Sequence, residues 1–260
     1  MKLDRVREKL LKENYISFTT DLDWAPECAI KDTLEMFVGN KIRPTVFITH
    51  TSAEVKKFTE AIDVGIHPNL IMPSSQGNNQ EEILDFCCGL VSDTKVFRCH
   101  RWYASNDVYK YLWNKGYRYE SNLCTNMDVV GPFAHRSGMI SFPVFFEDGA
   151  HIEHNKELQY SHFKDYFRRN GLKVINIHPM HYALNTPYFS YTRGIKDRLS
   201  REEWNGMDES RLKELKYDGL GIRDFINDMI EDALSNGAKV ISLLDAYKMC
   251  LEGQDVQPSL

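Results

Sequence analysis

A single α/β domain of the barrel type is the fold class that the sequence predicts, and three observations point to it. Segments rich in β-branched and aromatic residues alternate with segments of helical periodicity. The 260 residues fit one such domain, and no linker divides residues 1–260. Aspartates and histidines follow several predicted strands, at the end where α/β barrels carry their chemistry.

Composition narrows the class of protein further. Hydrophobic residues make up 42% and charged residues 27%, as in ordinary globular proteins. The formal net charge of -5 argues against a non-specific nucleic-acid binder. The charged N-terminus and the lack of an 18-residue apolar run predict a cytoplasmic protein without a membrane span. The six cysteines show no CxxC pairing, so we expect reduced thiols and no zinc ribbon.

The first predicted strand covers residues 15–20 and ends in two carboxylates, Asp21 and Asp23. A turn at Trp24 would let both carboxylates point the same way, one to hold a metal and the other to act as a base. The alternative is that Asp21 is a turn residue and Asp23 an N-cap for the helix that begins near Pro26.

The remaining elements follow in β-α order. The predicted strands are 43–49, 64–67, 95–100, 117–123, 138–146, 172–179 and 239–243. The predicted helices are a charged N-terminal helix, 26–39, 52–62, 80–90, 106–115, 156–170, 222–235 and a final C-terminal helix. Residues 183–208 form a long aromatic and basic segment. Strands that alternate with helices predict a mainly parallel sheet, closed or nearly closed.

Five side chains of chemical interest fall at the predicted strand ends. The C-terminal ends of parallel strands meet at one rim, so we expect these side chains to share it. They are Asp23, His67, His100, Asp148 and His178.

In this order the residues resemble the polysaccharide deacetylase superfamily, also called NodB-homology or carbohydrate esterase family 4, from Tyr15 to about Leu243. The similarity is closest to the intracellular, WbmS-like branch found with O-antigen genes. It implies a distorted (β/α)7 barrel that removes N-acyl groups from sugars with a divalent metal. The motif Thr-Phe-Asp-Asp is similar to 20–23 with one residue inserted, which implies Asp21 as base and Asp23 as metal ligand.

The other motifs match to different degrees. His67 matches the first histidine of His-Ser/Thr-x-x-His, but Ile71 stands in the place of the second. Arg98 occupies the arginine place of Arg-x-Pro-Tyr, and His100, where proline is usual, is the candidate for the missing ligand.

The resemblance also assigns an acid. His178, after an apolar strand, is placed as the general acid, and Asp148 as the residue that orients its ring, with Glu147 as an alternative. Arg98 would hold Asp21 ionised. The alternative interpretation is that Arg98 forms only a surface ion pair. Two histidines and one carboxylate suit zinc, with cobalt, nickel or iron(II) as alternatives.

Other polar clusters have simpler interpretations. His151 and His154 could ligate a metal, but a solvated position is the favoured interpretation for both, as for His162 and His181. The basic segment 193–198, near Tyr188 and other aromatic residues, could meet a nucleotide's phosphates and base, yet a solvated loop is favoured.

The function predicted is a metal-dependent carbohydrate N-deacetylase of the cytoplasm. A nucleotide- or lipid-linked sugar of surface-glycan assembly is the predicted substrate, with no nucleic-acid partner. The alternatives are a deformylase or other C-N hydrolase on the same barrel, and a non-catalytic carbohydrate-binding member. Metal content separates the last from the others, and release of acetate or formate separates the first two.

Overall fold

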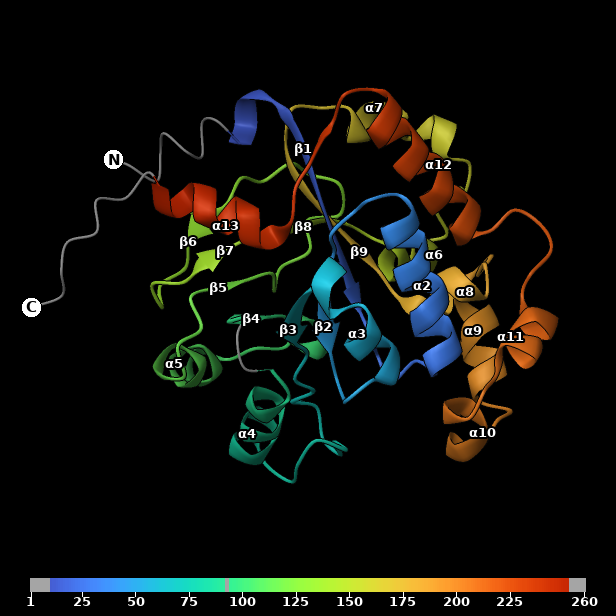
Figure 1. The fold of residues 1–260 in the computed structure, drawn as a ribbon, viewed down its shortest axis with the longest axis horizontal. Helices are drawn as coiled ribbons and strands as arrows, with labels where there is room; N and C mark the ends of the chain where they lie inside the picture. Colours follow the sequence, from blue (N-terminus) through green and yellow to red (C-terminus); the bar gives the residue numbers. More distant parts are fainter. Residues whose placement is uncertain (1–9, 92–93, 253–260) are drawn as a thin grey trace, which may run out of the picture.

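The computed structural model describes residues 10–91 and 94–252, which form one curled sheet surrounded by helices (Figure 1). Most of the predicted N-terminal helix, residues 1–9, lies outside the described residues. The strands are β1 (Asn14–Asp21), β2 (Thr45–Ile48), β3 (Asp63–Ile66), β4 (Val96–Phe97), β5 (Tyr119–Glu120), β6 (Phe133–Ala134), β7 (Ile140–Ser141), β8 (Val144–Glu147), β9 (Gly171–Ile177) and β10 (Lys239–Val240).

The helices lie between these strands in the chain. The α-helices are α2 (Glu27–Gly39), α3 (Ala53–Lys57), α4 (Gln80–Leu90), α5 (Asn106–Asn114), α6 (Asp148–Glu153), α7 (Lys164–Phe167), α8 (Pro179–Ala183), α9 (Phe189–Lys196), α10 (Arg201–Asn205), α11 (Glu209–Leu215), α12 (Ile222–Ser235) and α13 (Leu243–Glu252). Short 3-10 turns occupy Thr59–Ala61, His100–Trp102 and Tyr160–His162. Within the described residues, no helix is both long and apolar enough to cross a membrane.

The sheet runs in the order β6-β7-β5-β4-β3-β2-β1-β9-β8, and β10 pairs with β1. All pairs are parallel except β6 with β7. β1 and β9 form the long central pair, in register from Asn14 with Gly171 to Thr20 with Ile177 (Figure 1). Their carboxyl ends therefore lie side by side.

Main-chain hydrogen bonds bring the two ends of this sheet together. After β5, the Leu123 carbonyl accepts from the Val144 N–H at 2.7 Å, and the Thr125 N–H donates to the Val144 carbonyl at 2.8 Å. The Met127 N–H then donates to the Phe145 carbonyl at 2.7 Å. The ring β1, β2, β3, β4, β5, β8 and β9 is thus connected all the way round, which confirms the expected distorted (β/α)7 barrel.

Apolar side chains from opposite strands of this ring fill the barrel. Residues from β1, β2, β4, β5, β8 and β9 belong to one buried cluster, which α13 covers with Ala246 and Cys250. A second cluster joins the outer face of β8 and β9 to α12, whose buried residues recur at helical spacing. These include Ile222, Phe225, Ile226 and Met229. The burial holds the strand ends in fixed positions.

Several element predictions are wrong in detail. The predicted strand 138–146 is two strands, since Pro143 separates β7, which pairs with β5, from β8, which pairs with β9. The predicted helix 156–170 contains only a 3-10 turn and α7, because the Glu157 carbonyl accepts a hydrogen bond from His151 Nε2 at 2.9 Å and ties this stretch to α6.

The basic segment 193–198, for which a solvated loop was favoured, is mostly helical, and it lies within the aromatic and basic segment 183–208. The longer segment contains α9 and α10, and its side chains are anchored in the fold. Ile195 is buried, the Tyr191 hydroxyl donates to the Leu215 carbonyl at 2.8 Å, and Trp204 Nε1 donates to the Trp24 carbonyl at 3.1 Å. Figure 1 places α8 to α11 together on one side of the sheet, beside α2.

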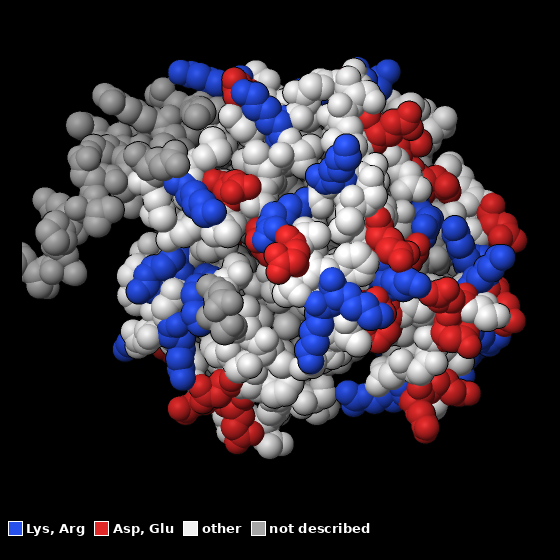
Figure 2. Space-filling view, viewed as in Figure 1, with Lys and Arg blue, Asp and Glu red and all other residues white. Residues whose placement is uncertain are grey.

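The face of the molecule drawn in Figure 2 carries mixed charge. Figure 2 shows lysine and arginine interspersed with aspartate and glutamate over the face in view, without a broad area of one sign.

Candidate active site

A tight turn after β1 separates the two aspartates of the first motif. Asp21 is the last residue of β1, whereas Asp23 and Trp24 have φ of 44° and 55°. Non-glycine residues at such φ are strained and concentrate at functional sites. The N-cap of α2 is Pro26, so the interpretation of Asp23 as the cap is wrong.

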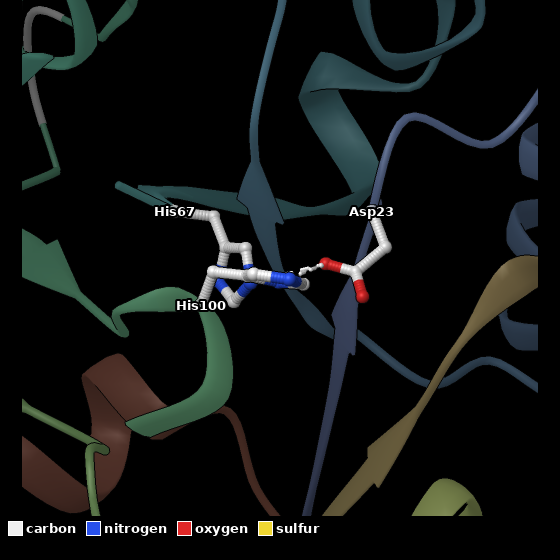
Figure 3. A group of neighbouring side chains, drawn as sticks. All are labelled: Asp23, His67 and His100. Carbon is white, nitrogen blue, oxygen red and sulfur yellow. Dashed lines mark hydrogen bonds and ion pairs between the residues drawn. The ribbon is translucent and has the colours of Figure 1, made fainter. Parts of the chain in front are cut away.

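Asp23, His67 and His100 converge from three different strand ends (Figure 3). His67 Nε2 lies 3.2 Å from Asp23 Oδ1, and His100 Nδ1 lies 3.0 Å from the same oxygen. One ligand atom from each residue lies within 4.8 Å of the others. Although burial opposes ionisation of Asp23, hydrogen bonds from His100 and His67 hold its pKa well below the ordinary value.

His100 reaches this cluster through an unusual backbone turn. β4 ends at Phe97, earlier than predicted, and residues 100–102 form a 3-10 turn in which Arg101 and Trp102 have φ of 53° and 59°. The His100 N–H donates to the Pro68 carbonyl at 2.9 Å, which ties the turn to the residue after His67. The two rings meet edge to face with centroids 5.5 Å apart.

Beneath the cluster, Asp21 forms a buried ion pair with Arg98. Arg98 Nη1 lies 2.9 Å from Asp21 Oδ1, and the arginine side chain is fully buried, so its interpretation as a surface pair is wrong. Burial raises the pKa of Asp21, but the charges of Arg98, His67 and His178 outweigh it and leave the pKa below its ordinary value. Asp21 is therefore ionised at neutral pH.

The sequence interpretation missed Asn176. Its Nδ2 donates to Asp21 Oδ2 at 2.8 Å, and its Oδ1 accepts from Arg98 Nη1 at 2.6 Å. Asn176 precedes His178 by two residues near the end of β9, so both side chains project to the same face of the sheet. That spacing is the signal that could have found it.

His178 is held by Asp148. Its Nδ1 lies 2.6 Å from Asp148 Oδ1, and its backbone N–H donates to Asp148 Oδ2 at 2.8 Å. Glu147, the alternative partner, lies 3.8 Å from the other ring nitrogen, Nε2. Burial alone would lower the pKa of His178, but the Asp148 carboxylate raises it well above the ordinary value.

These groups open into a cleft of about 620 Å³, a size typical of small-molecule sites. Its wall includes Trp24, Trp102, Glu147, Phe189, Arg193 and Lys196. His178 Nε2 faces it, at 4.0 Å from Asp21 Oδ2 and 3.8 Å from Asp23 Oδ2. Burial raises the pKa of Glu147 to about 7.

The remaining histidines have other environments. His154 and His162 are exposed, as expected. His151 was expected to be solvated but is buried, because it packs against Phe146, Phe163 and Phe225. His181, also expected to be solvated, is half-buried at the cleft. The centroids of its ring and of the His178 ring lie 5.7 Å apart.

The barrel, with carboxylates and histidines at the carboxyl ends of its strands, belongs to the class of polysaccharide deacetylases. The family model "WbmS-like: Polysaccharide deacetylase" matches residues 18–193. The chain belongs to the WbmS-like polysaccharide deacetylase family. No curated protein matches it significantly.

Solved structures share the fold. A putative polysaccharide deacetylase of Bordetella bronchiseptica, WbmS, described as involved in O-antigen biosynthesis, has a TM-score of 0.73 at 24% identity over 84% of this chain and 90% of that one. A putative polysaccharide deacetylase from Mycobacterium smegmatis has a TM-score of 0.57 at 12% identity, covering 95% and 94%. The Bc1960 peptidoglycan N-acetylglucosamine deacetylase has a TM-score of 0.50 at 13% identity, covering 92% and 90%.

Proposed function

We propose that the protein is a metal-dependent N-deacylase that removes an acetyl group from an amino sugar. One observation carries the proposal: a two-histidine, one-carboxylate cluster stands between an ionised aspartate and a histidine that a second aspartate holds protonated. Family membership supports the reaction class. A base, a metal site and an acid can together supply what amide hydrolysis needs: an activated water, a stabilised oxyanion and a proton for the leaving amine.

The donor set fits a divalent metal. Asp23, His67 and His100 present one carboxylate and two imidazoles, the ligands preferred by zinc and its neighbours. His67 supports the fit because its Nδ1 is buried without a hydrogen-bond partner among the described residues, a cost that a ligand from outside the chain could offset. A metal held there would supply Lewis acidity and make a bound water more acidic.

The base half of the reaction falls to Asp21. Arg98 and Asn176 donate hydrogen bonds to its two oxygens. In its ionised form, Asp21 accepts the proton of the attacking water. The guanidinium fixes the carboxylate and keeps its pKa low, so it remains a base over a wide pH range.

The acid half falls to His178. Asp148 accepts the hydrogen bond of Nδ1–H, so Nε2–H of the imidazolium points into the cleft. From there it donates a proton to the nitrogen of the departing amine, which is too basic to leave without one. Glu147 lies beside that nitrogen and does not orient the ring.

The substrate that we propose is a nucleotide- or lipid-linked sugar used in surface-polysaccharide assembly. A cleft of about 620 Å³ accommodates a sugar together with part of its carrier. The six cysteines are all free, which supports a reducing compartment such as the cytoplasm.

The test compares two leaving groups in the His178→Ala variant, with His154→Ala as the matched control. Hydrolysis of an N-acetyl sugar should fall steeply, whereas an activated acetyl ester, whose leaving group needs no proton, should lose much less. The exposed His154 should affect neither. Equal losses on both substrates would rule out the acid role. Release of formate from an N-formyl sugar, with no acetate from its N-acetyl counterpart, would make the enzyme a deformylase.

Metal content tests the other half. His67→Ala and His100→Ala should each lower stoichiometric metal binding, because each removes one of three protein ligands. Full retention of metal in His100→Ala would remove His100 from the site. A wild-type protein that takes up no divalent metal would favour a non-catalytic binding role.

A further inference from the structure

One face of α9 borders the cleft. The residues of this helix that border the cleft are Phe189, Thr192, Arg193 and Lys196. Their spacing of i, i+3, i+4 and i+7 is that of one helical stripe. Ile195 is buried behind them, and the Tyr191 hydroxyl anchors the helix on Leu215. The fold therefore places an aromatic ring and two cations at the cleft.

The two cations keep donors available. Arg193 uses Nε for Asp197, at 3.1 and 3.2 Å, and its two Nη groups make no hydrogen bond with any described residue. The Lys196 ammonium lies 5.2 Å from the centre of the Trp204 ring and has no carboxylate partner among residues 10–91 and 94–252. The Nη groups of an arginine and the ammonium of a lysine are donors that bind phosphate oxygens when no other acceptor occupies them.

A third cation borders the cleft from another element. Arg101 lies in the strained turn after β4, is exposed, and forms no ion pair within the described part of the chain. The carboxylates of Asp21 and Asp23 are already matched by Arg98 and by the histidines. The exposed Glu153 on α6 also borders the cleft and would repel an anion, so a bound anion is expected beside the cations and away from this carboxylate.

We propose that Arg101, Arg193 and Lys196 bind the phosphate groups that link the sugar to its carrier, and that Phe189 contacts the carrier beyond them. The Phe189 ring is 49% exposed, which leaves its face free for a nucleobase or an isoprenoid chain. The inference rests on the proposed function, because it places the amide of the same substrate at Asp21 and His178.

The test is calorimetric titration of chelator-treated protein, so that phosphate cannot bind to a metal. Three probes are used: inorganic pyrophosphate, uridine diphosphate and geranyl diphosphate. Arg193→Gln and Lys196→Gln should each weaken pyrophosphate binding about tenfold or more, as for loss of a charge-assisted hydrogen bond. Arg198→Gln is the matched control, since Arg198 is exposed, donates from Nε to the Gly194 carbonyl and does not border the cleft.

Each outcome decides the inference. Tighter binding of uridine diphosphate than of pyrophosphate supports a nucleotide carrier, and tighter binding of geranyl diphosphate supports a lipid carrier. No binding of any probe overturns the inference, as does equal weakening by Arg198→Gln.

The proposed function can fail separately. Wild-type protein that hydrolyses an N-acetyl sugar but binds no pyrophosphate would overturn only the inference. Protein that binds pyrophosphate through Arg193 but hydrolyses no sugar amide would overturn the proposed function and would leave a phosphate site without the sugar substrate.

Discussion

Arg98 lies beneath the floor of the cleft and is fully buried, whereas Arg193 borders the wall of the same cleft with a side chain that is 67% exposed. The Arg98 side chain makes five hydrogen bonds, to Thr19, Asp21, Ser121 and Asn176. Arg193 meets one carboxylate, that of Asp197, on its own helix.

This difference in burial distinguishes two roles of an arginine side chain. A buried guanidinium stays favourable only when its donors are satisfied, and it then fixes the charge of its partner. An exposed guanidinium contributes little to folding and keeps its donors for molecules from solvent. In our proposals the floor serves proton transfer and the wall serves recognition, and the following variants examine that division.

The largest effect is expected from Asp21→Asn on the floor. The asparagine keeps the shape but cannot act as a base, so turnover should fall by roughly 10²–10⁴. Metal content, measured by elemental analysis, should match that of wild type because Asp23 is the carboxylate that faces His67 and His100. Loss of metal in this variant would show that the roles of the two aspartates are exchanged.

Arg98→Met should be the most destabilising of these variants. It leaves the carboxylate of Asp21 buried without its cation, which typically costs about 3–5 kcal/mol. Urea unfolding measures the free energy. The double variant Arg98→Met/Asp21→Asn should recover part of the loss, because it removes the unpaired charge. No recovery would mean that the packing of Arg98 on Phe47 outweighs the ion pair.

Glu147→Gln should show a pH-dependent gain in stability. Burial raises the pKa of Glu147 to about 7 in the folded state, above the ordinary value of 4.5. The folded state therefore holds a proton that the unfolded chain releases between these pH values, and wild-type stability falls as pH rises through them. The free energy of unfolding of the variant, relative to that of wild type, should therefore increase by up to about 3 kcal/mol as the pH is raised from below 5 to 8.

The Glu147 experiment uses metal-free protein, because a bound cation would attract the carboxylate and lower its pKa. The free energy of unfolding is compared at several pH values. A difference between variant and wild type that stays constant with pH would show that Glu147 titrates normally.

Arg193→Gln should have the smallest effect on folding. An exposed ion pair within one helix contributes little, so the free energy of unfolding should change by less than about 0.5 kcal/mol. Urea unfolding beside Arg98→Met gives the direct contrast. If Arg193→Gln lowered the free energy of unfolding as much as Arg98→Met does, Arg193 would stabilise the fold. The distinction between floor and wall would then be lost.

Continuous apolar and β-branched runs identified β1 and β9 from the sequence alone, and with them the ends that carry Asp21, Asp23 and His178. A buried parallel strand needs such a run, since both of its faces are covered. The same logic failed where local sequence did not decide the structure. Pro143 split one predicted strand between two places in the sheet, and residues 193–198, which were interpreted as a loop, lie mostly in α9.

Only the tertiary structure decided which side chains meet. His100 reaches Asp23 because the chain turns through positive φ at Arg101 and Trp102, a strain that surrounding packing must hold. Asn176 is part of the site because β9 pairs with β1 in one register, and Arg193 reaches the cleft because α9 presents one face to it. Residue types and strand ends are local properties of the sequence. Register, helix orientation and strained turns depend on contacts between distant segments, and these arise only when the whole chain is folded.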